Sequence, residues 1–225
     1  MKLFNKLSSL LNNRSSSIQN KNMMLVDAYW NGSDDDALIS ELDNLLQECS
    51  TRAEKLIRIA ELCLPATTNE QLYYASKSYV WAGASYRKEA IYYLEKYIEA
   101  GATYENAPTG FREINGIVYD LKSMDISNTY SDLAGCYEGE HEFDKAIENY
   151  QKASDFSPSI PTYIVKQAQI YVKKNQLNTA KKLLESAATT KYYEHEEFRS
   201  IIDKYLLNVN EKISNGYVYK PRKRK

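Results

Sequence analysis

The chain has 225 residues, of which 43% are hydrophobic and 26% charged, a composition typical of a folded globular protein rather than a disordered or fibrous one. Nine of its 29 basic residues lie in residues 1–22 and 220–225, which contain no acids. The remaining 20 basic residues face 30 acidic ones, so residues 23–219 carry a net charge of about −10. No apolar run approaches the roughly 18 residues of a membrane span, and the first residues lack the apolar centre of a signal peptide.

Residues 1–22 are predicted to form a basic N-terminal segment that is flexible or docked onto the protein's own body. A stripe of apolar residues at helical spacing, with lysines off it, could lie on a membrane surface, on a partner or on the body. The Ser- and Asn-rich residues 12–22 predict a flexible linker. The stripe consists of Leu3, Phe4, Leu7, Leu10 and Leu11.

Residues 23–30 are apolar enough to cover one end of a helical array, and Asn31 and Gly32 end them. Three consecutive aspartates follow at residues 34–36. They lack the alternating ligands, central glycine and closing glutamate of a calcium loop. We therefore interpret them as the cap of a helix N-terminus, where acids favour the free N–H groups.

Residues 34–67 and 71–104 each contain two short helical patterns. The second helical pattern of each has an alanine at the corresponding place, Ala53 and Ala90. The match is weaker in residues 34–67, where Glu41 and Asn44 stand where the other copies have a small and a large residue. Further members of the pattern in residues 71–104 are Tyr74, Ser78, Trp81, Leu94 and Tyr97.

Residues 105–126 interrupt this spacing. Residues 108–110 mark a turn, after which Phe111, Ile114, Val118 and Leu121 recur at helical spacing. We predict that the next helix begins near residues 111–113 and runs to about residue 138. The alternative is a separate helix that ends near residue 125, with Ser127 capping the next one. In either case the insertion should project beyond the regular stack.

Residues 127–160 contain two helical patterns joined by a polar turn and ended by Pro158. The pattern returns 34 residues later, so that Ala134 matches Ala168 and Ala146 matches Ala180. Small residues lie where two helices must approach closely, and large ones fill the gaps between helices. The large residues are Tyr130, Tyr137, Phe143 and Tyr150.

This repeated pattern of small and large residues resembles the tetratricopeptide repeat, a helix–turn–helix unit of 34 residues. The resemblance implies an all-α, right-handed α-solenoid of three to four hairpins, at about 34–67, 71–104, 127–160 and 161–194. Each hairpin buries its neighbour's apolar face. Residues 195–214 form one apolar stripe opposed by polar residues, as expected of a C-terminal capping helix. Residues 215–225 are a basic tail.

The resemblance also implies that the first helices of successive hairpins line a concave groove that receives a peptide. Chaperone-binding relatives clamp a terminal carboxylate with lysines and asparagines. At such positions this chain has Ser131 and Gly135 in one repeat and Val165 and Gln169 in the next. Tyr79, Trp81 and Tyr86 form the best aromatic patch, although we expect Trp81 to be a core residue. The candidate groove residues are Tyr79, Asn128, Ser131, Glu138, Thr162, Val165, Gln169 and Val172.

Motifs for catalysis are missing from the sequence. The two histidines, His141 and His195, have no histidine partner four residues away, and no phosphate-binding loop or nucleophile elbow is present. The three cysteines, Cys49, Cys63 and Cys136, do not have metal-site spacing, and we interpret them as reduced core residues in a cytoplasmic protein. We predict no enzyme activity, no cofactor and no metal.

The predicted function is therefore protein–protein or protein–peptide interaction by an adaptor or scaffold, with a partner that the residues do not identify. The alternative is an accessory protein that binds nucleic acid or anionic membrane through its basic ends. The acidic body opposes that alternative because it repels phosphates. The residues of the candidate electrostatic tail are Lys220, Arg222, Lys223, Arg224 and Lys225.

Overall fold

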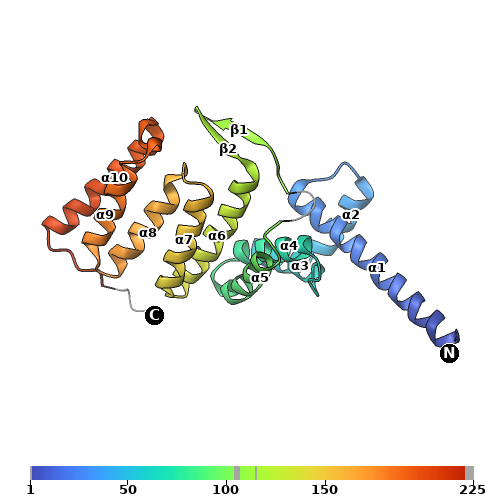
Figure 1. Ribbon diagram of the computed structural model, residues 1–225. Coiled ribbons are helices and arrows are strands. Elements are labelled where there is room, and N and C mark those ends of the chain that lie inside the picture. Colours follow the sequence, from blue (N-terminus) through green and yellow to red (C-terminus); the bar gives the residue numbers. More distant parts are fainter. Residues whose placement is uncertain (1, 104–106, 115, 221–225) are drawn as a thin grey trace. The chain divides into compact units, whose positions relative to one another are not determined.

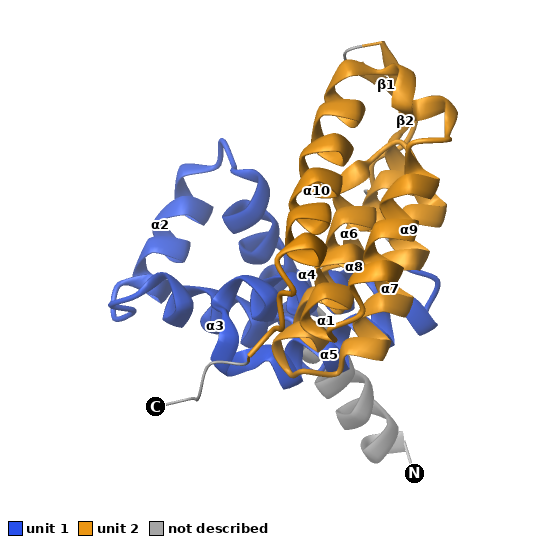
Figure 2. Ribbon diagram, turned by 90° about the vertical axis from the view of Figure 1, so that its left-hand side faces the viewer, with its two compact units in different colours: residues 1–105 blue, residues 106–225 orange. Residues whose placement is uncertain are grey.

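The structure, a computed structural model, describes residues 2–103, 107–114 and 116–220, with side chains from residue 17 onward. The chain divides into two compact units, Met1–Glu105 and Asn106–Lys225, which are described separately (Figure 2). Unit 1 contains α1 (Lys2–Asn31), α2 (Asp36–Leu46), α3 (Arg52–Leu62), α4 (Asn69–Ala82), the 3-10 turn η1 (Ala84–Tyr86) and α5 (Arg87–Glu99). Unit 2 contains β1 (Phe111–Ile114), β2 (Ile117–Asp120), α6 (Leu121–Gly139), α7 (Phe143–Phe156), α8 (Pro161–Lys173), α9 (Leu177–Ala187), η2 (Lys191–Glu194) and α10 (Glu196–Ser214) (Figure 1).

Helix α1 continues through residues 12–22, so the prediction of a flexible linker there is wrong. The end of this stretch is held against the body of unit 1. Lys21 forms an ion pair with Glu41 at 2.8 Å, and the Asn22 amide donates to the Leu62 carbonyl at 3.5 Å. These contacts and the buried residue Val26 fix the C-terminal half of α1 on the unit.

The predicted first hairpin, residues 34–67, does not form as expected. Helix α2 packs mainly against α1, whereas α3 packs mainly against α4. Ala37 is exposed and Ala53 only half-buried, while Ala90 in the next hairpin is completely buried. The physical reason is that Leu46 of α2 shares a core with Val26 of α1. Helix α1 therefore takes the place that α3 was expected to have as the packing partner of α2.

The starts of α2, α3 and α4 in unit 1 are capped by side chains. Asp35 accepts from the amides of Ala37 and Leu38 at 2.9 and 3.1 Å, which confirms the capping interpretation of the aspartate run. Thr51 and Thr68 each form a capping box at the starts of α3 and α4.

Unit 2 is a stack of helix hairpins, α6–α7 and α8–α9, followed by α10 (Figure 1). The small residues expected at the close approaches are fully enclosed: Ala134, Ala146 and Ala180 have no exposed surface, and Ala168 is 1% exposed. Helix α10 buries Phe198, Ile202 and Val209 against α8 and α9. The prediction of a helical solenoid closed by a C-terminal helix is confirmed.

Residues 111–120 form an antiparallel β-hairpin, so the predicted helix over this stretch is wrong in both of its forms. The signal that was missed is the dipeptide Asn115–Gly116 between apolar residues, which is the strongest short-range indication of a two-residue hairpin loop. Asp120 caps α6 by accepting from the Lys122 amide at 3.2 Å. Ser127 therefore lies inside α6, where it is buried, and does not cap a helix.

Candidate protein-binding surface

The first helices of the two hairpins in unit 2, α6 and α8, carry most of the predicted groove residues. Asn128 and Thr162 are exposed, and Ser131 and Gln169 are half-buried. Val165 is different: it is 4% exposed and belongs to the core cluster around Ala180. Val172 packs against the same cluster. The prediction that Val165 faces a ligand is corrected, because the core of the α8–α9 hairpin uses its apolar surface, whereas Val172 is only half-buried.

An ion pair connects α6 with α8. The Lys173 ammonium lies 2.5 Å from the carboxylate of Glu138, whose side chain is 16% exposed. The Tyr150 hydroxyl from α7 donates to the same carboxylate at 3.4 Å and lies 3.7 Å from the place that a Cβ on Gly135 would occupy. Burial and the Glu138 charge raise the pKa of Tyr150, so its hydroxyl stays protonated and acts as a donor.

A buried polar network lies close to Asn128. The Ser127 hydroxyl has no exposed surface and lies 3.0 Å from the Ser157 hydroxyl and 3.1 Å from that of Tyr163. Tyr163 donates to the Asn128 amide oxygen at 3.0 Å. This network connects α6 and α8 with the turn between α7 and α8, and it fixes the side chain of Asn128 at the surface.

The aromatic patch predicted in unit 1 is divided between core and surface. Tyr79 is 7% exposed and stacks on Tyr93, with ring centroids 5.5 Å apart and an interplanar angle of 7°. Trp81 is 54% exposed, so the expectation that it is a core residue is wrong. Its ring is covered by the Arg52 guanidinium at 5.3 Å. Tyr86 lies at the edge of this group, 6.3 Å from the Tyr79 ring.

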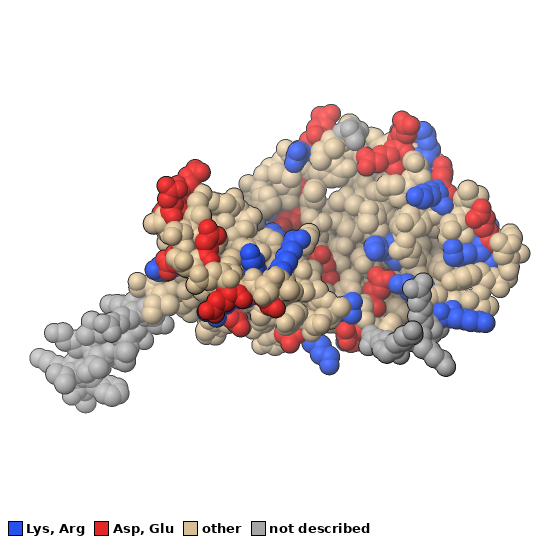
Figure 3. All heavy atoms as spheres, turned by 180° about the vertical axis from the view of Figure 1, so that it is seen from behind, with Lys and Arg blue, Asp and Glu red and all other residues tan. Residues whose placement is uncertain are grey.

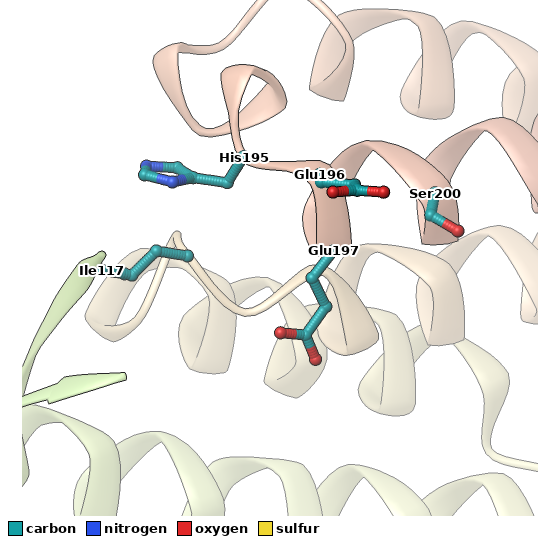
Figure 4. A pocket seen from close by; sticks show the side chains of 5 residues that line it. All are labelled: Ile117, His195, Glu196, Glu197 and Ser200. Atoms are coloured by element: carbon teal, nitrogen blue, oxygen red, sulfur yellow. The ribbon is translucent and has the colours of Figure 1, made fainter. Parts of the chain in front are cut away.

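A cavity of about 450 Å³ opens between β2 and the start of α10 (Figure 4). It is lined by Ile117, His195, Glu196, Glu197 and Ser200, and Figure 4 shows the Glu197 side chain extending away from α10 toward the helices of unit 2. Burial and the nearby Glu197 carboxylate raise the pKa of Tyr119. The cavity is acidic on one side and apolar at Ile117.

The two histidines lie in different settings. His195 precedes α10, whereas His141 is exposed in the turn between α6 and α7, its ring 5.7 Å from that of Phe143. Within the described residues, no three His, Cys, Asp or Glu side chains are close enough together to hold a metal ion.

The basic tail is described only in part. Lys220 is exposed, while Arg222, Lys223, Arg224 and Lys225 lie outside the described residues. The Tyr219 amide donates to the Asn175 side chain at 2.6 Å, which holds the start of the tail at the turn between α8 and α9. On the face shown in Figure 3, the described Lys and Arg side chains are interspersed with Asp and Glu.

Comparison with known protein families finds no family model that matches the chain. Among solved structures, a MamA fragment (41 to the end) from Desulfovibrio magneticus RS-1 is 17% identical, covers 83% of this chain and 92% of its own, and has a TM-score of 0.47. A crystal structure of MamA protein is 15% identical, with coverages of 90% and 98% and a TM-score of 0.46. A second MamA crystal structure is 18% identical, with coverages of 73% and 90% and a TM-score of 0.45.

At these identities and TM-scores the likeness is distant. None of the helices in the described part of the chain combines the length and hydrophobicity that crossing a membrane requires.

Proposed function

We propose that this chain is a non-catalytic protein- or peptide-binding module of the tetratricopeptide type, and that it binds its partner on the surface of α6 and α8. The observation that supports this is that different residues of these hairpins form the core and the surface. The core is closed by Ala134, Ala146 and Ala180, while Asn128 and Gln169 keep surface that the core does not use. Helical repeat arrays commonly bind partners on the extended surface that successive repeats form.

The chemistry of this surface favours an uncharged, extended segment of a partner. Asn128 and Gln169 offer amide donors and acceptors, and Gly135 leaves room for a close approach above the Tyr150 hydroxyl. Glu138 and Lys173 on this surface form an ion pair and neutralise each other. A strongly acidic or basic peptide would gain no net electrostatic attraction from this pair.

The test is affinity capture from a lysate of the native host with the full chain as bait. Gln169→Arg places a long charged side chain on the proposed surface, and Gln151→Arg makes the same change on α7, where Gln151 is exposed. We expect a specific partner to be retained by the wild type and by Gln151→Arg, and to be lost with Gln169→Arg. Equal retention by both variants would place binding elsewhere.

The absence of catalysis and the cytoplasmic location are parts of the same proposal. Cys63 lies at the C-terminal end of α3 and is fully buried. Burial, together with the negative charge of Glu70, raises the pKa of its thiol to about 12. A thiol in this setting is a poor nucleophile, and Cys49 and Cys63 as free thiols suit a reducing compartment. If the captured material is instead nucleic acid, and capture disappears on removal of residues 220–225, the alternative function through the basic tail is favoured.

A further inference from the structure

The hairpin β1–β2 leaves one face and one edge uncovered. Its register places Phe111, Glu113, Val118 and Asp120 on the same, outer face. Phe111 is 78% exposed and Val118 62%, whereas Ile117 on the opposite face is buried. Two large apolar side chains on the outer face of a two-stranded sheet are unfavourable in water, so a partner would stabilise this face by covering them.

The outer edge of β1 also offers unused backbone groups. The Leu121 amide donates to the Gly110 carbonyl at 3.0 Å, which identifies this pair as hydrogen-bonded. Hydrogen-bonded and non-hydrogen-bonded pairs alternate in an antiparallel ladder, so the N–H and C=O groups of Phe111 and Glu113 point away from β2. In the described part of the chain, the sheet has only β1 and β2. This edge can therefore accept a third strand.

The charges around the hairpin indicate a basic strand. Glu113 and Asp120 both lie on the outer face of the hairpin. Arg112 is the one basic residue of the hairpin sequence, and it lies on the opposite face. A strand with apolar residues followed by lysines and arginines would complement both the exposed side chains and the carboxylates.

The C-terminal segment of the chain has this chemistry. Residues 217–220 are in neither helix nor strand, and Tyr217 and Val218 are 38% and 60% exposed. Tyr and Val favour extended strands. In an extended chain Val218 and Lys220 lie on the same side, so they match the pair Phe111 and Glu113, and four further basic residues follow.

The tail of the same copy does not reach the hairpin while Tyr219 is held by Asn175. The hairpin lies beside the start of α10, and the tail leaves the end of this 19-residue helix, about 28 Å away. Residues 221–225 span at most about 17 Å when fully extended. In Figure 1 the hairpin lies at the top of unit 2, whereas the described chain after α10 runs toward the bottom.

We propose that residues 217–225 of one copy add as a strand to the β1 edge of a second copy, with the basic residues of the tail facing Glu113 and Asp120 on the outer face of the hairpin. The contact is head to tail, so each copy offers both a hairpin and a tail, and association proceeds to short chains of molecules rather than to closed pairs. This interaction uses neither α6 nor α8 and is independent of the proposed partner-binding surface.

The test is sedimentation velocity of the full chain over a wide range of concentrations, in low and in high salt. We expect concentration-dependent association that weakens at high salt, because exposed charges are screened. Glu113→Lys reverses the charge at the edge and should weaken association at least about tenfold, and Phe111→Ser should weaken it similarly. Glu185→Lys, an equal change at an exposed position of α9, should leave it unchanged.

A synthetic peptide with the sequence of residues 217–225 should compete with association, whereas a scrambled peptide of the same composition should compete poorly. A protein that remains monomeric at every concentration would overturn the proposal. Association that is insensitive to Glu113→Lys and Phe111→Ser, or equal competition by the two peptides, would also overturn it, because the β1 edge or the strand order would then not matter.

Discussion

The Lys173 ammonium lies 2.5 Å from the Glu138 carboxylate, so an ion pair joins the first helices of two consecutive hairpins. Both side chains keep some contact with water, at 33% and 16% exposure, which limits the strength of the pair. Its position is of interest because it holds α6 and α8 in register at the surface where we place the partner.

This ion pair should show a small, salt-sensitive coupling energy. A double-mutant cycle with Glu138→Gln and Lys173→Met is expected to give about 0.5–1 kcal/mol in low salt, measured by urea unfolding with far-UV circular dichroism. The pair Lys181–Glu185 on α9, at 3.6 Å and more exposed, serves as the control and should give less. Equal coupling energies for the two pairs would show that the ion pair between helices adds no stability beyond that of a pair within one helix.

Ala146 should not tolerate a larger side chain. It has no exposed surface where α7 approaches its neighbours, so Ala146→Leu is expected to lower the free energy of unfolding of unit 2 by about 1–3 kcal/mol through overpacking. The same change at exposed Ala37 on α2 should have little effect. Urea unfolding followed by circular dichroism measures both, and a neutral Ala146→Leu variant would contradict the close helix approach.

The Ser127 hydroxyl should contribute to stability out of proportion to its size. Ser127→Ala removes the partner of two buried hydroxyls, Ser157 and Tyr163, and is expected to cost about 1–3 kcal/mol. Ser186→Ala, at an exposed position of α9, is the matched control and should change stability by less than about 0.5 kcal/mol. A Ser127→Ala variant as stable as the control would show that these hydroxyls find other partners.

Unit 1 should lose stability at alkaline pH because of Cys63. Burial raises the pKa of its thiol to about 12 in the folded state, while an unfolded thiol ionises near 8.5–9. The neutral thiol is favoured by folding, so stability is complete below the unfolded pKa. It then falls as pH rises toward the folded value, by up to about 1.4 kcal/mol per pH unit.

The measurement compares the wild type with Cys63→Ala between about pH 8 and pH 10. Both tryptophans, Trp30 and Trp81, belong to unit 1, so fluorescence during urea unfolding reports on this unit. Ionisation of tyrosines affects both proteins and cancels in the difference. The wild type should lose stability more steeply than the variant, and parallel curves would contradict the burial of the thiol.

The β-hairpin shows where reasoning from periodicity failed. Phe111, Ile114, Val118 and Leu121 are spaced like one face of a helix, yet the first three lie on two strands. Gly116 adopts a φ of 77°, which other residues reach only with strain, and the sequence Asn115–Gly116 favours a two-residue hairpin loop. Local turn chemistry therefore outweighed a helical period that was short and interrupted.

The sequence by itself determined the solenoid class, the hairpins of unit 2 and the capping helix, because the spacing of Ala134, Ala146 and Ala180 requires helices that approach closely. Only the tertiary structure decided which surface residues remain available. It assigned Val165 to the core and Trp81 to the surface, and it paired α2 with α1. The physical reason is that a period identifies the buried face of one helix, whereas exposure depends on which neighbouring element covers that face.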